Sequence, residues 1–69
     1  MEKIKITSDY IQLDQFLKYV NLVGSGGEAK ILISEGRVKV NDAVEMRRGK
    51  KLRTNDIVSI DDEISYSIE

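Results

Sequence analysis

The chain has 69 residues, of which 41% are hydrophobic and 33% charged, and its formal net charge is −1 at pH 7. A chain of this length and composition forms one small hydrophobic core and leaves little room for a deep catalytic cleft. It contains no histidine and no cysteine, which excludes the commonest general base, thiol nucleophiles, the usual zinc ligands and disulfide bonds. We therefore expect a single domain over residues 1–69 that is not an enzyme, with no catalytic residue, metal site or cofactor. No segment resembles a signal peptide or a membrane span, so we also expect a soluble, cytoplasmic protein.

The first half of the chain predicts one short strand and two helices. Ile4 and Ile6 alternate with charged residues and indicate an edge strand. A helical spacing follows, in which apolar residues recur at i, i+3, i+4 and i+7: Leu13, Phe16, Leu17 and Val20. A second helix is expected to begin at Ser25, because Ser25 and Glu28 have the spacing of a capping box, and to end at Gly36, which can adopt a positive φ angle.

A β-hairpin is predicted after the second helix, because valines alternate with basic residues there and a turn-forming Asn-Asp pair follows. Two registers are open. A two-residue turn would place Val38 opposite Glu45, whereas a three-residue loop would place Val40 opposite Val44. We favour the second register because it pairs apolar residues on the buried face, although Ala43 is a poor residue for a positive φ angle.

Two further strands are predicted over residues 57–60 and 64–68, joined by an acidic turn at 61–63. The turn carries three consecutive carboxylates, but adjacent residues of a hairpin turn cannot all converge on one ion, and the spacing of a calcium loop is missing. We interpret the turn as a solvated connection and not as a metal site.

Basic residues are concentrated in the middle of the chain. Residues 30–53 contain eight of the eleven basic residues and three of the twelve acidic ones, which is a net charge of +5 against −6 for the remainder. The alternative explanation is a loop rich in lysine and arginine that only keeps a small protein soluble. We favour a phosphate-binding surface, because the cations come from a helix, a hairpin and a loop that are neighbours in the chain and can share one face. Residues 47–53, which we call the basic loop, hold most of them.

The start of the second helix is a second candidate for phosphate contact, since the first N–H groups of a helix are unpaired. The glycine-rich segment 24–27 is followed by Glu28 and Ala29 and so lacks the Gly-Lys-Ser/Thr ending of a nucleotide-binding loop. The alternative is that Ser25 is only a helix cap and that the glycines permit close packing of the two helices. Single-strand binding depends on exposed aromatic rings, and the chain has three tyrosines and one phenylalanine. This scarcity favours structured RNA, recognised by its backbone shape.

Three segments together resemble the S4 RNA-binding domain, and the resemblance covers about residues 12–60. The segments are Leu13-Asp14 at the start of the first helix, Ser-Gly-Gly-Glu-Ala at 25–29, and Gly-Arg-Val-Lys-Val-Asn-Asp at 36–42. Two segments are similar in particular to the small stand-alone bacterial S4 proteins of the YaaA and YbcJ type, namely Leu-Val-Gly-Ser-Gly-Gly-Glu-Ala-Lys at 22–30 and Arg-Arg-Gly-Lys-Lys-Leu at 47–52.

The resemblance implies an α+β fold of the S4 type, with two short antiparallel helices packed on a small, largely antiparallel β-sheet. It implies an RNA-binding accessory protein without catalytic activity that binds structured ribosomal RNA and acts in ribosome assembly or function. We expect a monomer with no small-molecule substrate and no membrane partner. The alternative is a protein-interaction module whose basic face binds an acidic protein partner.

The residues expected to contact RNA come from the second helix, the hairpin and the basic loop: Ser25, Gly26, Gly27, Lys30, Arg37, Lys39, Asn41, Arg47, Arg48, Lys50, Lys51 and Arg53. Three positions depart from the family pattern. Gln12 and Gly26 stand where arginine is frequent, and Asp42 replaces the usual glycine of the hairpin tip. Because two cations are missing from the usual contact positions, binding should depend more on the basic loop.

Overall fold

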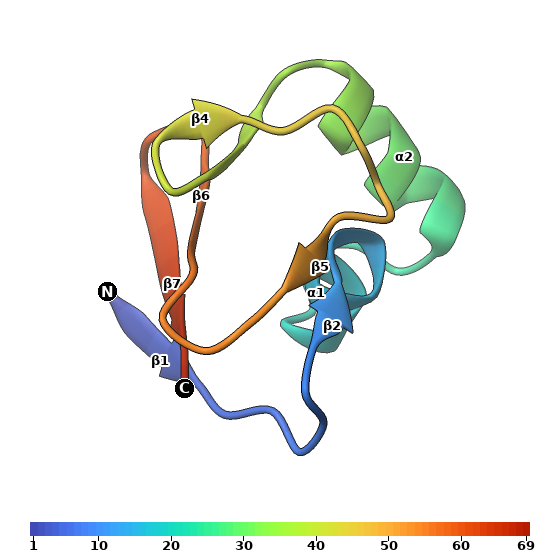
Figure 1. The fold of residues 1–69 in the computed structure, drawn as a ribbon. Coiled ribbons are helices and arrows are strands. Elements are labelled where there is room, and N and C mark those ends of the chain that lie inside the picture. Colours follow the sequence, from blue (N-terminus) through green and yellow to red (C-terminus); the bar gives the residue numbers. More distant parts are fainter.

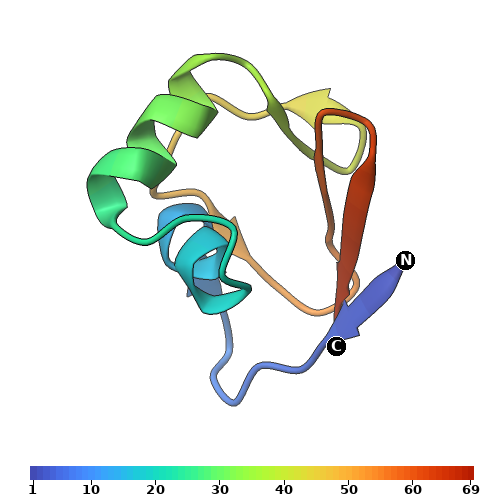
Figure 2. The same cartoon turned by 180° about the vertical axis from the view of Figure 1, so that it is seen from behind.

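The computed structural model describes residues 1–69 and consists of two helices packed against a sheet, with a small two-stranded ribbon beside them (Figures 1 and 2). The elements in chain order are β1 (Glu2–Ile4), β2 (Ile11–Gln12), α1 (Leu13–Tyr19), α2 (Gly26–Ser34), β3 (Val38–Val40), β4 (Ala43–Val44), β5 (Lys51–Leu52), β6 (Ile57–Ile60) and β7 (Ile64–Ile68). Neither helix is long and apolar enough to cross a membrane.

The main sheet has five strands in the order β1-β7-β6-β3-β4. Every pair in it is antiparallel except β1 and β7, which run parallel and set Lys3 opposite Ser67. The strand predicted from Ile4 and Ile6 is therefore an edge strand, as expected, but it ends at Ile4 and does not include Ile6. The predicted α+β architecture, with two helices on a largely antiparallel sheet, is confirmed.

The second sheet is a ribbon of two short strands that the sequence did not indicate. Ile11 of β2 pairs with Leu52 of β5, and Gln12 pairs with Lys51. Strands of two residues are too short to show an alternating pattern. The ribbon matters for the site, because β5 is part of the basic loop and β2 leads directly into α1.

Helix α2 has the boundaries that its capping residues predicted. Ser25 is the N-cap of α2, and its Oγ accepts a hydrogen bond from the Glu28 N–H at 3.2 Å. The helix ends where Gly36 adopts a φ angle of 73°, a conformation that costs glycine little. In α1 the apolar stripe faces inwards, with Leu13, Phe16 and Leu17 fully buried.

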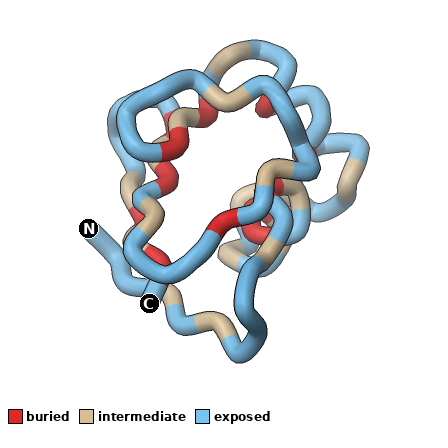
Figure 3. Tube along the Cα trace, in the orientation of Figure 1, coloured by how far each residue is buried: buried red, intermediate tan, exposed pale blue.

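The core lies between the helices and the inner face of the main sheet (Figure 3). Twelve residues are buried, and none of them is charged: Leu13, Phe16, Leu17, Ala29, Ile33, Val38, Val40, Leu52, Val58, Ile60, Tyr66 and Ile68. Phe16 of α1 meets Tyr66 of β7 edge to face, with ring centroids 5.6 Å apart and an interplanar angle of 81°. This geometry is favourable for aromatic pairs and joins α1 to the main sheet.

The hairpin between β3 and β4 has a two-residue turn, with Val40 opposite Ala43. Asn41 and Asp42 have φ angles of 52° and 70°, as a type I′ turn requires. The predicted three-residue loop is therefore wrong. The burial argument failed because Val44 is 51% exposed. Turn chemistry decided the register, since asparagine and aspartate adopt left-handed conformations more readily than alanine.

Candidate nucleic-acid interface

The basic loop lies across the N-terminal end of α1 and is held there by backbone hydrogen bonds. The N–H groups of Leu13 and Asp14 donate to the carbonyl oxygens of Lys50 and Arg48, at 2.8 and 2.9 Å. The first N–H groups of a helix have no partner within the helix, and the N-cap residue Gln12 supplies no side-chain cap. The loop carbonyls take the place of that cap, and the loop backbone is thereby fixed on the helix.

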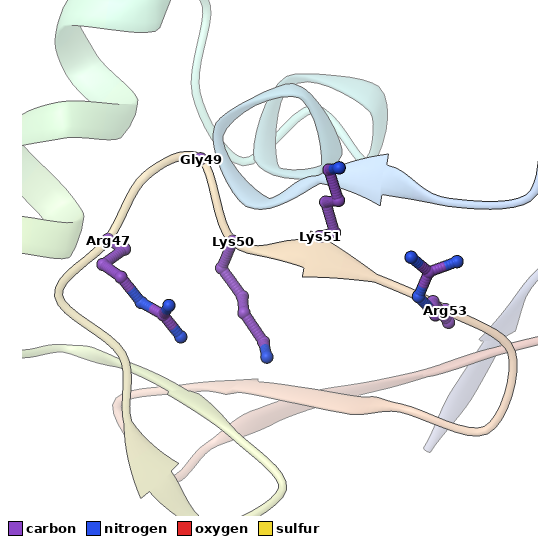
Figure 4. Close-up of a pocket in the computed structure, with 5 residues that line it drawn as sticks. All are labelled: Arg47, Gly49, Lys50, Lys51 and Arg53. Carbon is purple, nitrogen blue, oxygen red and sulfur yellow. The ribbon is translucent and has the colours of Figure 1, made fainter.

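Side chains of the basic loop surround an open depression in the surface (Figure 4). Five residues line it, and none of them is acidic or hydrophobic: Arg47, Gly49, Lys50, Lys51 and Arg53. Figure 4 shows the side chains of Arg47 and Lys50 extending in the same direction, whereas Lys51 extends to the other side of the loop. Several cations gathered on one short segment create a positive potential that attracts anions.

Among these cations, Arg47 is the one held in an ion pair. Its Nε donates to Oε2 of Glu45 at 3.0 Å, and its Nη2 donates to Oε1 at 3.2 Å. These hydrogen bonds lower the pKa of the Glu45 carboxyl group and raise the pKa of the Arg47 guanidinium. The backbone N–H of Arg47 also donates to Oε2 at 3.0 Å. Glu45 therefore fixes the start of the loop, while the Arg47 side chain stays 71% exposed.

The remaining cations of the basic loop are free of carboxylates. The four ion pairs of the structure involve arginine and lysine residues at positions 37, 39 and 47. None of them includes Arg48, Lys50, Lys51 or Arg53. These four side chains can therefore meet a phosphate without first breaking an internal ion pair.

Two of the predicted contact residues, Arg37 just before β3 and Lys39 within it, face the acidic turn at 61–63. Arg37 donates from Nε and Nη2 to the two carboxylate oxygens of Asp61, at 2.9 and 2.7 Å, and from Nη1 to Glu35 at 3.2 Å. Lys39 Nζ lies 3.0 Å from Oδ1 of Asp62. The pKa of Asp61 is lowered, chiefly by the hydrogen bonds from Arg37. Carboxylates thus already occupy both cations, and Figure 1 shows the β6–β7 turn on the side opposite the bend of the basic loop.

Both polar atoms of the Asn41 side chain make hydrogen bonds within the protein, which gives this residue a structural role. Its Nδ2 donates to Oδ1 of Asp56 at 3.0 Å, and its Oδ1 accepts from the Ile57 N–H at 2.9 Å. Asp56 also accepts from the Arg53 N–H at 2.8 Å. The hairpin tip is therefore tied to the segment that follows the basic loop, and RNA contact by Asn41 stays a prediction.

The start of α2 presents the backbone of two glycines beside the exposed side chain of Glu28. A Cβ atom added at Gly26 would meet nothing within 4 Å, and one at Gly27 would meet only the Ser25 Oγ at 3.8 Å. The alternative that these glycines permit close helix packing is therefore wrong. Their first-turn N–H groups, at the positive end of the helix dipole, are available to an anion. Lys30, one turn further along, is exposed.

Tyr10 belongs to the same surface, although the sequence did not mark it. The Nζ atom of Lys51 lies 4.8 Å from the centre of its ring, and the Cζ atom of Arg53 lies 5.6 Å away. Tyr10 directly precedes β2, so it is the β2–β5 ribbon that brings it beside these cations. Because the ribbon was not predicted, neither was this contact.

The fold and this cationic loop define a small S4-type domain. The sequence model described as S4 domain matches residues 4–69, and the chain belongs to that family. The chain is 43% identical over 65 residues to the Probable ribosome maturation protein RlbA of Bacillus subtilis, which covers 94% of this chain and 92% of that protein. It is 42% identical over 50 residues to YbcJ of Escherichia coli, covering 72% of this chain and 71% of that protein.

Two solved structures are similar to this chain over most or nearly all of its length. The solution structure of Escherichia coli YbcJ, described as having an ALFAL motif involved in RNA binding, superposes with a TM-score of 0.71 and 33% identity, over 99% of this chain and 86% of YbcJ. The ribosomal protein S4e of Thermoplasma acidophilum superposes with a TM-score of 0.65 over 88% of this chain and 32% of S4e. At 20% identity, that second likeness shows the fold alone.

Proposed function

We propose that this protein is an RNA-binding accessory protein without catalytic activity, which binds structured ribosomal RNA and acts in ribosome assembly as a cytoplasmic monomer. The observation that carries the proposal is the basic loop, where a fixed backbone presents four cations that form no ion pair. Phosphate contacts by such cations supply most of the sequence-independent affinity for nucleic acids. The names of the relatives, a ribosome maturation protein and a protein with an RNA-binding motif, support the same function.

The proposal assigns different roles to the residues expected to contact RNA. Four cations of the basic loop neutralise phosphates: Arg48, Lys50, Lys51 and Arg53. The exposed side chain of Arg47 also contacts phosphate. The N–H groups of Gly26 and Gly27, with Lys30, form a second contact at the start of α2, where Ser25 keeps the helix end in place. Arg37 and Lys39 take part only where RNA displaces the carboxylates that hold them.

A charge-matched pair of variants tests the basic loop. The loop variant replaces three cations of the basic loop with glutamine: Arg48, Lys50 and Lys51. The control variant replaces the three basic residues outside residues 30–53 with glutamine: Lys3, Lys5 and Lys18. Both variants lose the same charge. Each lost phosphate contact lowers the log–log slope of affinity against salt by about 0.7–0.9. On purified ribosomal RNA, the magnitude of this slope should therefore be about 2.1–2.7 lower for the loop variant than for the wild type. The control variant should have the wild-type slope. Equal slopes in the two variants, with normal thermal unfolding, would refute the loop as the contact surface.

The ribosomal part of the proposal needs a separate experiment. Lysate from cells that express the tagged protein is centrifuged through sucrose gradients at low and at high salt. We expect the protein to sediment with ribosomal subunits or assembly intermediates at low salt and to leave them at high salt, because counterion release dominates the binding. A protein that stays at the top of the gradient at every salt, yet crosslinks to other RNA, would refute ribosomal binding alone. Capture of a protein partner that survives ribonuclease would favour the protein-interaction alternative.

A further inference from the structure

Tyr10 lies against two of the free cations of the basic loop. In the β2–β5 ribbon Ile11 is opposite Leu52, and one further step of this antiparallel register sets Tyr10 opposite Arg53. Leu52 is fully buried, so Lys51 and Arg53 project from the other face of the strand, where Tyr10 is 38% exposed. The distances to the ring centre, 4.8 Å from Lys51 Nζ and 5.6 Å from Arg53 Cζ, lie within the range of cation–π attraction.

The ring holds these cations in a way that a carboxylate does not. Glu45 fixes Arg47 by opposing its charge, whereas an aromatic ring attracts a cation through its quadrupole and leaves the full positive charge in place. Long basic side chains lose considerable rotamer freedom when they bind a ligand. A ring that already restricts Lys51 and Arg53 reduces that loss and keeps both charges available.

We infer that Tyr10, Lys51 and Arg53 form a subsite for the phosphodiester backbone of the bound RNA, in which Tyr10 is a positioning residue for the two cations. The inference rests on the proposed function, because it names part of the same RNA surface. Lys51, in β5, and Arg53, directly after it, lie on either side of the buried Leu52, so their charges lie on the same side of the ribbon and can meet one phosphate or two successive ones. The phenol ring is in contact with both cations.

A set of variants on one RNA separates positioning from other roles. Tyr10→Leu removes the ring, Tyr10→Phe keeps it, and Tyr19→Leu is the matched control. Tyr19 is an exposed tyrosine of α1 whose hydroxyl donates to the Lys5 carbonyl at 3.4 Å. On purified ribosomal RNA we expect Tyr10→Leu to weaken binding about 3-fold to 10-fold, and the other two variants to bind as the wild type does. Thermal unfolding of each variant checks that the fold is kept.

The decisive measurement is a double-mutant cycle. If Tyr10 acts through the two cations, Tyr10→Leu should weaken binding in the wild type and have no further effect in a Lys51→Gln/Arg53→Gln background. An equal loss in both backgrounds would overturn the inference, since the ring would then act on RNA directly or through the fold. Wild-type affinity for Tyr10→Leu, or a loss in Tyr10→Phe, would overturn it as well. Each of these outcomes leaves the proposed function standing. Failure of the wild-type protein to bind ribosomal RNA would refute the proposed function, and the subsite with it.

Discussion

Replacing Asp61 and Asp62 with asparagine should strengthen RNA binding, because the acidic turn now neutralises two cations of the hairpin. Asp61 accepts two hydrogen bonds from Arg37, and Asp62 accepts one from Lys39. Both aspartates have a φ angle of 55°, and asparagine is among the few residues that tolerate this conformation. The substitution therefore removes the charges and keeps the turn. The ion pairs are exposed at the surface, so we expect only a small loss of stability.

The size of the effect follows from how many cations are released. Lys39 loses its only carboxylate partner, whereas Arg37 keeps Glu35 at 3.2 Å. Each released cation that neutralises a phosphate steepens the log–log slope of affinity against salt by about 0.7–0.9. The slope should therefore steepen by about 0.7–1.8, which corresponds to a gain in affinity of about 4-fold to 30-fold at ~0.15 M salt if the gain vanishes at ~1 M.

Titration of purified ribosomal RNA over a range of KCl concentrations measures this slope. Glu63→Gln is the control, because Glu63 belongs to the same turn and makes no ion pair. The change in slope that Glu63→Gln causes measures the general effect of losing one negative charge. The Asp61→Asn/Asp62→Asn variant must change the slope by more than this for each carboxylate removed. The reasoning is refuted if the slope of the double variant stays at the wild-type value, since the freed cations would then not reach RNA.

Three further substitutions test other parts of the structure. Gly26→Arg should fold normally, since a Cβ atom there meets nothing within 4 Å, and should strengthen RNA binding by up to about 3 kcal/mol through one added contact. Weaker binding of the folded variant would instead indicate close backbone approach to the RNA. Asp42→Gly should raise the free energy of unfolding in urea by up to about 1 kcal/mol, because glycine adopts a φ of 70° at little cost, and a lower value would contradict the type I′ turn. Burial, with a smaller contribution from Glu2, raises the pKa of Tyr66, so the unfolded chain loses the phenol proton first and stability falls as pH rises above ~10. Tyr66→Phe should lose less stability than the wild type across that range, and identical pH profiles would refute the assignment.

Local chemistry that acts within a few residues was predictable from the sequence. The stripe of Leu13, Phe16 and Leu17 indicated α1, and Ser25 with Gly36 indicated both ends of α2, because caps depend on short-range hydrogen bonds and backbone conformation. The last two strands, β6 and β7, were also predicted with the bounds that the structure has. In each case the residues that decide the conformation are adjacent in the chain.

Features that depend on distant segments were not predictable in the same way. The β2–β5 ribbon pairs residues about forty positions apart with two-residue strands, too short for any periodicity. The loop carbonyls that cap α1 likewise come from Arg48 and Lys50. The hairpin register is a different case, since turn chemistry and burial disagreed at the sequence level. The left-handed preference of Asn41 and Asp42 was the better guide, because β4 is an exposed edge strand with no core to bury its side chains.

The pairing of charges, and not their number, should determine how this nearly neutral chain binds RNA. Residues 30–53 contain eight cations, and a surface that used all of them would give a log–log slope of about 5.6–7.2. Carboxylates hold three of the eight, at positions 37, 39 and 47. The five free ones, four in the basic loop and Lys30 on α2, would give about 3.5–4.5. A wild-type slope within the lower range would indicate that the ion pairs persist in the complex. A slope above about 5.6 would show that RNA displaces the carboxylates of the acidic turn, and it would contradict the prediction that Asp61→Asn/Asp62→Asn steepens the slope.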